Sequence, residues 1–234
     1  ADNPGDPVGA EFQVNNTATN SQVTPAVAID ADGDFVVVWQ GDGEIGKDSF
    51  GAPIIVTGVF ARCYSNTGLA AGSEFPIDAS STAESPSVAM DADGDFVVVW
   101  EGEGPVDSAG VFYRRFYANG SAIDATQQRA NQLPGGTQED ASVAMNATGD
   151  FVVVWEEGGR IKFQMFDSDG STGTAKEVYT DTVSSNPDVA MDAVGNFVVV
   201  YRWNGGSGRG IWGHQFDNTG TEQAPWFRVG PGNL

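Results

Sequence analysis

The stretch VAMDADGDFVVVW, residues 88–100, occurs in four versions along this chain of 234 residues. The other three are VAIDADGDFVVVW (27–39), VAMNATGDFVVVW (143–155) and VAMDAVGNFVVVY (189–201). Self-similarity over a period of tens of residues is typical of propellers and other repeat arrays. The repeat is therefore the feature that decides the fold class.

Each copy has the pattern of a β-hairpin. A short apolar strand leads into an Asp/Asn-Ala-x-Gly-Asp/Asn turn, which leads into Phe-Val-Val-Val-Trp/Tyr. Gly33 and its equivalents stand where the turn needs a positive φ, and Asp30 and its equivalents can hydrogen-bond the turn backbone. The valine run does not alternate with polar residues, so we expect this strand to be buried on both faces.

Two further strands follow each hairpin. The third strand of each repeat is VFARCY (59–64), VFYRRF (111–116), IKFQMF (161–166) or IWGHQF (211–216), and an outer strand of the EFPID type (74–78) comes next. No segment has helical periodicity, and blades stacked face to face bury both faces of a strand without helices. The sequence predicts an all-β fold, a four-bladed β-propeller built from four repeats of about four antiparallel strands, with the valine-alanine strand innermost.

The predicted domain organisation is simple. Residues 1–10 form an extended N-terminal tail, and 11–234 form one propeller domain with blades at approximately 21–78, 85–133, 140–180 and 186–230. The outer strand has five candidates, because 11–16 and 226–229 both resemble it. Either one terminal strand packs elsewhere, or the chain is a segment of a longer array whose edge strand can pair with another molecule.

The charge balance limits the partners. The chain has 32 acidic and 11 basic residues and a formal net charge of −21, which makes nucleic acid a poor partner. No apolar run approaches the roughly 20 residues of a transmembrane helix. Cys63 is the only cysteine, so no internal disulfide can form. These features leave a cation, a protein partner or a glycan as ligands.

The string VAMDADGDFVVVW, followed by a GVFARCY-like strand and an EFPI strand, resembles a repeat of large bacterial extracellular and surface proteins. The resemblance covers roughly residues 11–230. It implies a bacterial, secreted or cell-surface module with a propeller-like fold. It implies no catalytic residue.

The turns of the first two repeats carry alternating carboxylates with a glycine, as calcium-binding loops do. These candidate metal ligands are Asp30, Asp32, Asp34, Asp91, Asp93 and Asp95. Thr148 and Val194 replace the middle aspartate in the later copies. We therefore favour a structural turn, with calcium as a candidate cofactor of the first two copies.

Candidate contact residues lie where the repeats differ. Three tryptophans occur only in the last repeat, and acidic residues follow the valine strands of the first two. The candidates are Trp203, Trp212, Trp226, Asp42, Glu44, Glu101 and Glu103. Trp39 and its equivalents recur in every repeat, so we interpret them as packing residues.

Three functions are consistent with these patterns. The favoured one is a non-catalytic extracellular binding, adhesion or assembly module with an acidic, calcium-binding surface, whose partner is another protein or a second copy that pairs through open edge strands. The alternative is a carbohydrate-binding, lectin-like propeller. A propeller hydrolase is weaker, because the sequence singles out no pair of carboxylates and His214 is the only histidine.

Overall fold

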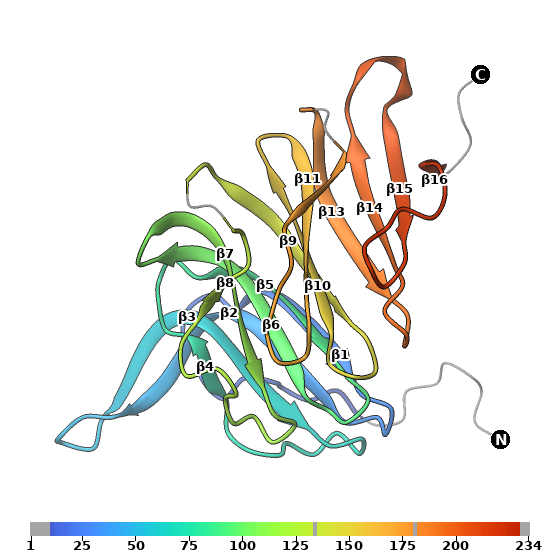
Figure 1. Cartoon of the computed structure of the whole chain (residues 1–234). Helices are drawn as coiled ribbons and strands as arrows, with labels where there is room; N and C mark the ends of the chain where they lie inside the picture. The colour runs from blue at the N-terminus through green and yellow to red at the C-terminus, as the bar shows by residue number, and fades with distance from the viewer. Residues whose placement is uncertain (1–9, 133–134, 180–181, 230–234) are drawn as a thin grey trace.

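The computed structural model describes residues 10–132, 135–179 and 182–229, so most of the predicted N-terminal tail lies outside the described residues. Each repeat forms one four-stranded antiparallel sheet, which confirms the all-β, four-bladed architecture (Figure 1). The first two blades are β1 (Val23–Ile29), β2 (Phe35–Lys47), β3 (Pro53–Tyr64) and β4 (Phe75–Asp78), then β5 (Glu84–Met90), β6 (Phe96–Gly104), β7 (Asp107–Phe116) and β8 (Gln128–Arg129). The last two are β9 (Gln138–Met145), β10 (Phe151–Glu157), β11 (Arg160–Phe166) and β12 (Lys176–Tyr179), then β13 (Ser184–Met191), β14 (Phe197–Trp203), β15 (Gly210–Phe216) and β16 (Phe227–Val229).

The hairpin turns have the predicted chemistry. Gly33 has a φ of 89°, and the side chain of Asp30 accepts hydrogen bonds from the amides of Asp32 and Asp34, both at 2.9 Å. A glycine takes this left-handed conformation without a steric penalty. The innermost strands β1, β5, β9 and β13 contact one another in sequence, as predicted for the valine-alanine strands.

Three apolar interfaces join the four blades. Val98 packs toward the first blade, whereas Val97 and Val99 pack toward the third, and all three are fully buried. Trp100 and Trp155 fill the same place in successive interfaces. The prediction that the valine strand is buried on both faces is confirmed for the second and third blades, whereas in the first and fourth blades one face of this strand is only half-buried. The terminal aromatic is a buried packing residue in all four blades, as predicted.

The acidic segment after the first valine strand, residues 40–57, is a paired hairpin and not an irregular loop. Strand β2 continues to Lys47 and pairs with β3 from Pro53, so the segment is a long hairpin. Its turn is closed by Asp48, whose side chain accepts hydrogen bonds from the amides of Phe50 and Ala52 at 2.8 and 2.9 Å. This aspartate gives the segment the same turn chemistry as the repeat, which allows the two arms to pair.

The blades follow one another in chain order and form an open arc (Figure 1). Within the described residues, no interface comparable to those between neighbouring blades joins β13 to β1. Strand β16, Phe227–Val229, supplies the outer strand of the last blade that was predicted at 226–229, whereas 11–16 belong to none of the described sheets. In the described ranges, no helix is long and apolar enough to cross a membrane.

Candidate functional site

A cleft of about 450 Å³ lies between the second and third blades, where β5, β6 and β9 approach one another. Five carboxylate side chains line this acidic cleft: Glu84, Glu101, Glu103, Glu139 and Asp140. Ser85, Thr137 and Gln138 add hydroxyl and amide groups to the lining. The cleft therefore offers many hydrogen-bond acceptors and few apolar contacts.

Two residues of the cleft have an unusual backbone conformation. Ser85 and Asp140 have φ values of 51° and 55°, as Thr24 and Asn186 do at 49° and 50° in the equivalent positions. Each lies at a bulge, where the pairing of the innermost strand with its neighbour shifts. Such conformations cost energy in residues other than glycine and concentrate at functional sites. The bulge recurs in all four blades, so it also belongs to the blade design.

The carboxylate of Asp140 links the third blade to the fourth. Its Oδ2 atom accepts hydrogen bonds from the backbone amide and the side-chain amide of Asn186, at 3.2 and 3.1 Å. One side of the Asp140 carboxylate is therefore held by the neighbouring blade. This contact fixes the position of an acidic group at the edge of the cleft.

Glu101 has a perturbed acidity. Burial raises the pKa of its carboxyl to about 7, and the nearby charges of Asp140 and Glu84 act in the same direction. The Ala141 amide, 3.4 Å from its Oε1 atom, opposes this shift. Glu156 on β10, outside the cleft lining, also has a raised pKa, chiefly through burial. A carboxyl group with a shifted pKa in a cleft, as Glu101 is, is a mark of a functional site.

The Glu101 shift predicts a pH dependence of stability. A raised pKa means that the folded protein binds more protons than the unfolded chain between about pH 4.5 and pH 7, so rising pH through this window removes stability. Glu101→Gln should abolish this part of the dependence. Urea unfolding of both proteins at pH 5 and pH 8 measures it, and a ¹³C titration of the Glu101 carboxyl should give a midpoint near 7. A midpoint at the ordinary value for glutamate would contradict the expectation.

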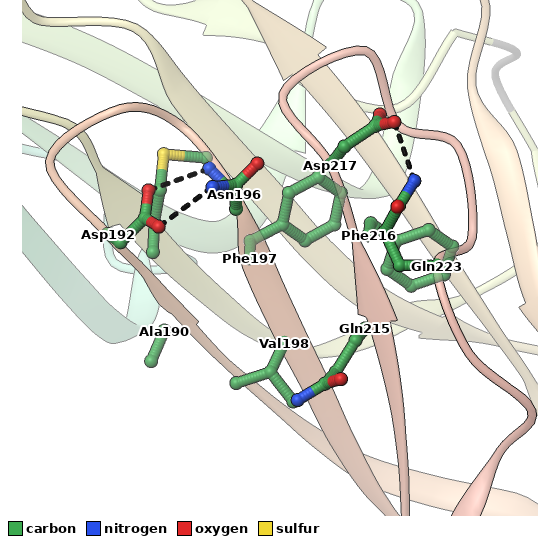
Figure 2. Close-up of a pocket in the computed structure, with 10 residues that line it drawn as sticks. Ala190, Asp192, Asn196, Phe197, Val198, Gln215, Phe216, Asp217 and Gln223 are labelled. Atoms are coloured by element: carbon green, nitrogen blue, oxygen red, sulfur yellow. Dashed lines mark hydrogen bonds between the residues drawn. The ribbon is translucent and has the colours of Figure 1, made fainter.

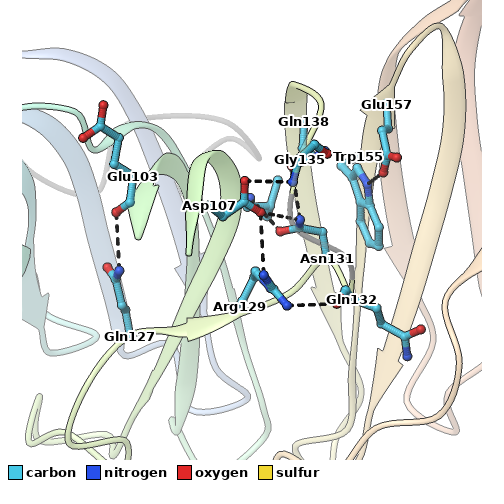
Figure 3. A network of polar contacts seen from close by, with 11 residues as sticks. Glu103, Asp107, Gln127, Arg129, Asn131, Gln132, Gly135, Gln138, Trp155 and Glu157 are labelled. Carbon is cyan, nitrogen blue, oxygen red and sulfur yellow. Dashed lines mark hydrogen bonds and ion pairs between the residues drawn. The ribbon is translucent and has the colours of Figure 1, made fainter. Parts of the chain in front are cut away.

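A buried polar network supports one wall of the cleft (Figure 3). Asp107 accepts hydrogen bonds from the side chain of Asn131 at 2.8 Å and from the Gly135 amide at 3.4 Å. Asn131 also donates to Gln138, the first residue of β9, at 3.1 Å. Arg129 lies 4.0 Å from Asp107 and supplies a positive charge. The network fixes the start of β9, so Asp107 has a structural role here.

The predicted acidic contact residues separate into two groups. Glu101 and Glu103 both line the acidic cleft. Asp42 is 7% exposed and accepts hydrogen bonds from Asn20 and from the Thr57 hydroxyl, so it stabilises the first hairpin. Glu44 is exposed further along that hairpin. Asp42 and Glu44 do not line the acidic cleft, because they belong to β2 of the first blade.

The three tryptophans of the last repeat, predicted as candidate contact residues, lie together in the structure. Trp212 packs edge-on against both Trp203 and Trp226, with ring centroids 6.0 and 4.6 Å apart. Trp226 is 53% exposed, and with Tyr179 and Tyr201 the cluster encloses a cavity of only about 20 Å³. The cluster is an exposed aromatic edge separate from the lining of the acidic cleft.

The aspartates of the DADGD turns have structural partners. The Asp34 carboxylate accepts a hydrogen bond from the Asn66 amide at 2.7 Å, and the Asp95 carboxylate accepts one from the Ala118 amide at 2.9 Å. Each aspartate therefore joins its hairpin to the next turn of the same blade. The described part of the chain contains no group of three or more histidine, cysteine, aspartate or glutamate side chains that could hold a metal ion. Calcium binding stays a prediction, which thermal melting with and without a chelator would test.

Two features of the structure were not predicted from the sequence. The bulge of the innermost strand has a sequence signal, because a polar residue precedes proline in Thr24-Pro25, Ser85-Pro86 and Asn186-Pro187. The buried His214 lies between Glu222 at 2.8 Å and the Tyr201 hydroxyl at 3.1 Å. Nothing in the sequence pairs these three residues, because Glu222 follows the strand in an irregular segment.

This chain resembles known proteins in its fold. No protein-family model and no curated protein sequence matches the chain. Among solved structures, the exo-β-1,3-galactanases of Clostridium thermocellum and Phanerochaete chrysosporium each superpose with a TM-score of 0.52 at 14% identity. The aligned region covers 94% of this chain and 52% of each galactanase chain. The chain therefore shares the fold of propeller glycosidases and spans about half the length of these two.

Proposed function

We propose that this chain binds carbohydrate in the acidic cleft. The observation that carries the proposal is a cleft of about 450 Å³ lined by five carboxylates, one of them Glu101 with a raised pKa. Sugar hydroxyl groups are hydrogen-bond donors, and a carboxylate accepts two of them at once through its paired oxygens. The volume lies within the range of small-molecule sites.

The fold likeness supports this proposal over an adhesion module without a defined ligand. The Phanerochaete structure contains β-1,3-galactotriose, and the same blade architecture here leaves a polar cleft between two blades. The adhesion hypothesis rests on the resemblance to repeats of bacterial surface proteins and on open edge strands, neither of which defines a ligand site. A cleft whose carboxylates are fixed by hydrogen bonds, as Asp140 is by Asn186, is a stronger basis for proposing a ligand.

Binding can be tested with a glycan array, followed by calorimetry with β-1,3-galactotriose and the best array ligands. We expect Glu101→Gln and Asp140→Asn to weaken binding at least about tenfold, the equivalent of about 1.4 kcal/mol. Glu44→Gln is the matched control, because it removes one charge from an exposed hairpin far from the cleft lining. Absence of binding at millimolar sugar, or equal binding by all variants, would refute the proposal.

Glycoside hydrolysis is a second candidate for the same cleft. The observation that favours it is Glu101, whose pKa of about 7 would let it retain a proton at neutral pH beside the carboxylate of Asp140. Glycosidases need one carboxyl to donate a proton and a second carboxylate to activate water or attack the sugar. Release of new reducing ends from the bound oligosaccharides, lost in Glu101→Gln, would distinguish hydrolysis from binding alone.

A further inference from the structure

The first blade exposes a face that is buried in every other blade. Val27 is 65% exposed, whereas its equivalents Val88, Val143 and Val189 are 8%, 6% and 9% exposed. In the second, third and fourth blades this face packs on the preceding blade. The first blade therefore exposes an apolar face of the same kind, on which none of the described sheets packs.

The fourth blade exposes the opposite face. Its hollow of about 610 Å³ is lined by Ala190, Val198 and Phe216 and bordered by Asp192 and Asp217 (Figure 2). The equivalents of Val198 in the two preceding blades, Val97 and Val152, are fully buried against the next blade. The two ends of the arc thus carry the two halves of the interface that is formed three times within the chain.

Residues 12–16 lie on the first blade as the outer strand of a preceding blade would. The ring of Phe12 packs on Tyr64 at 5.4 Å, and Arg62 donates a 2.8 Å hydrogen bond to the Val14 carbonyl. Between the first and second blades, Phe75 of β4 packs on Phe116 at 5.8 Å, and Arg114 donates to the Ile77 carbonyl at 3.3 Å. The spacing of two residues between ring and carbonyl is the same in both cases.

This placement defines what can fill the gap. Strand β4 pairs with β3 of its own blade, whereas residues 12–16 have no strand of their own among the described sheets. The fourth blade already has β16 as its outer strand. A second copy stacked end to end would bring its β16 to the place that residues 12–16 occupy. A blade that fills the gap therefore needs three strands of its own, because residues 12–16 supply the fourth.

We propose that the gap between the fourth and first blades binds a three-stranded antiparallel unit of this same repeat type, which takes residues 12–16 as its outer strand. The unit would consist of a hairpin of the VAMDADGDFVVVW kind and its third strand, apolar on both faces. The third strand of the unit would form backbone hydrogen bonds with residues 12–16 by strand addition. One face of the unit would cover Val27, and the other would cover Val198. The interface continues the one already present between neighbouring blades.

The test appends a copy of residues 84–124, which contains β5, β6 and β7, after Leu234 of the full chain. Residues 230–234 then separate β16 from the added unit, as 79–83 separate β4 from β5. We expect a monomer with a higher Tm, in which amide exchange of residues 12–16 slows at least about tenfold. The control appends the same unit with its three consecutive valines changed to serine, which should restore the exchange rates of the unextended chain.

Two results would overturn the proposal. One is unchanged exchange of residues 12–16 in the extended chain, whatever its Tm. The other is a dimer of the unextended chain, found by sedimentation, that protects residues 12–16 and is disrupted by Val27→Asp. That second result would make another copy of this chain the occupant.

Discussion

Trp100→Ala is expected to lower the free energy of unfolding by about 3 to 5 kcal/mol, the usual cost of removing a large buried aromatic side chain. Trp100 is fully buried between the first and second blades, with Phe112 at 6.5 Å between ring centroids. Its indole lies in the same apolar cluster as Val36, Val38 and Val59. Truncation would leave a cavity in the interface that holds the first blade in the arc.

Urea denaturation followed by far-ultraviolet circular dichroism measures this effect. Phe50→Ala is the control, because Phe50 is 94% exposed at the tip of the first hairpin and should change stability by less than about 0.5 kcal/mol. Equal stability of the two variants would show that the blades do not pack through Trp100. A loss of the first blade alone would appear as a separate, earlier transition.

Asp124→Asn is expected to cost about 3 kcal/mol, because it leaves the charge of Arg115 largely buried without its partner. Arg115 and Asp124 form a two-pronged ion pair, with 2.6 Å between Nη2 and Oδ1 and 2.9 Å between Nε and Oδ2. Asp124 also accepts the backbone amide of Arg115 at 2.9 Å. A further 2.7 Å hydrogen bond from Arg115 to the Ser168 carbonyl joins the second blade to the third.

The matched control is Glu177→Gln, which breaks the exposed pair of Arg160 and Glu177 at 3.1 Å. Their side chains are 43% and 32% exposed, so solvent screens the pair and its loss should cost less than about 1 kcal/mol. The two variants remove one charge each, which isolates the effect of burial. A similar small loss in both would contradict the structural role given to Arg115.

The acidic cleft could be predicted from the sequence only in part. Glu101 and Glu103 follow the valine strand of the second repeat, so their place at one end of a blade could be predicted. Their meeting with Glu139 and Asp140 depends on the packing of β6 against β9. The pKa of Glu101 depends on that packing as well, because burial is its main cause.

The four-stranded blade follows from local features of the sequence. Four copies of one hairpin, each with a turn glycine such as Gly94 and a valine run without alternation, allow few folds other than stacked four-stranded sheets. These signals are local, since turn chemistry and burial pattern are written in neighbouring residues.

The ends of the arc and the cleft between the second and third blades depend on tertiary packing. Residues 12–16 resemble an outer strand in sequence, but their place on Tyr64 and Arg62 of the first blade depends on contacts about fifty residues apart. The exposed Val27 and the buried Val88 have almost the same neighbours along the chain. Their difference comes from whether a preceding blade covers them, which is a property of the arc and not of the repeat.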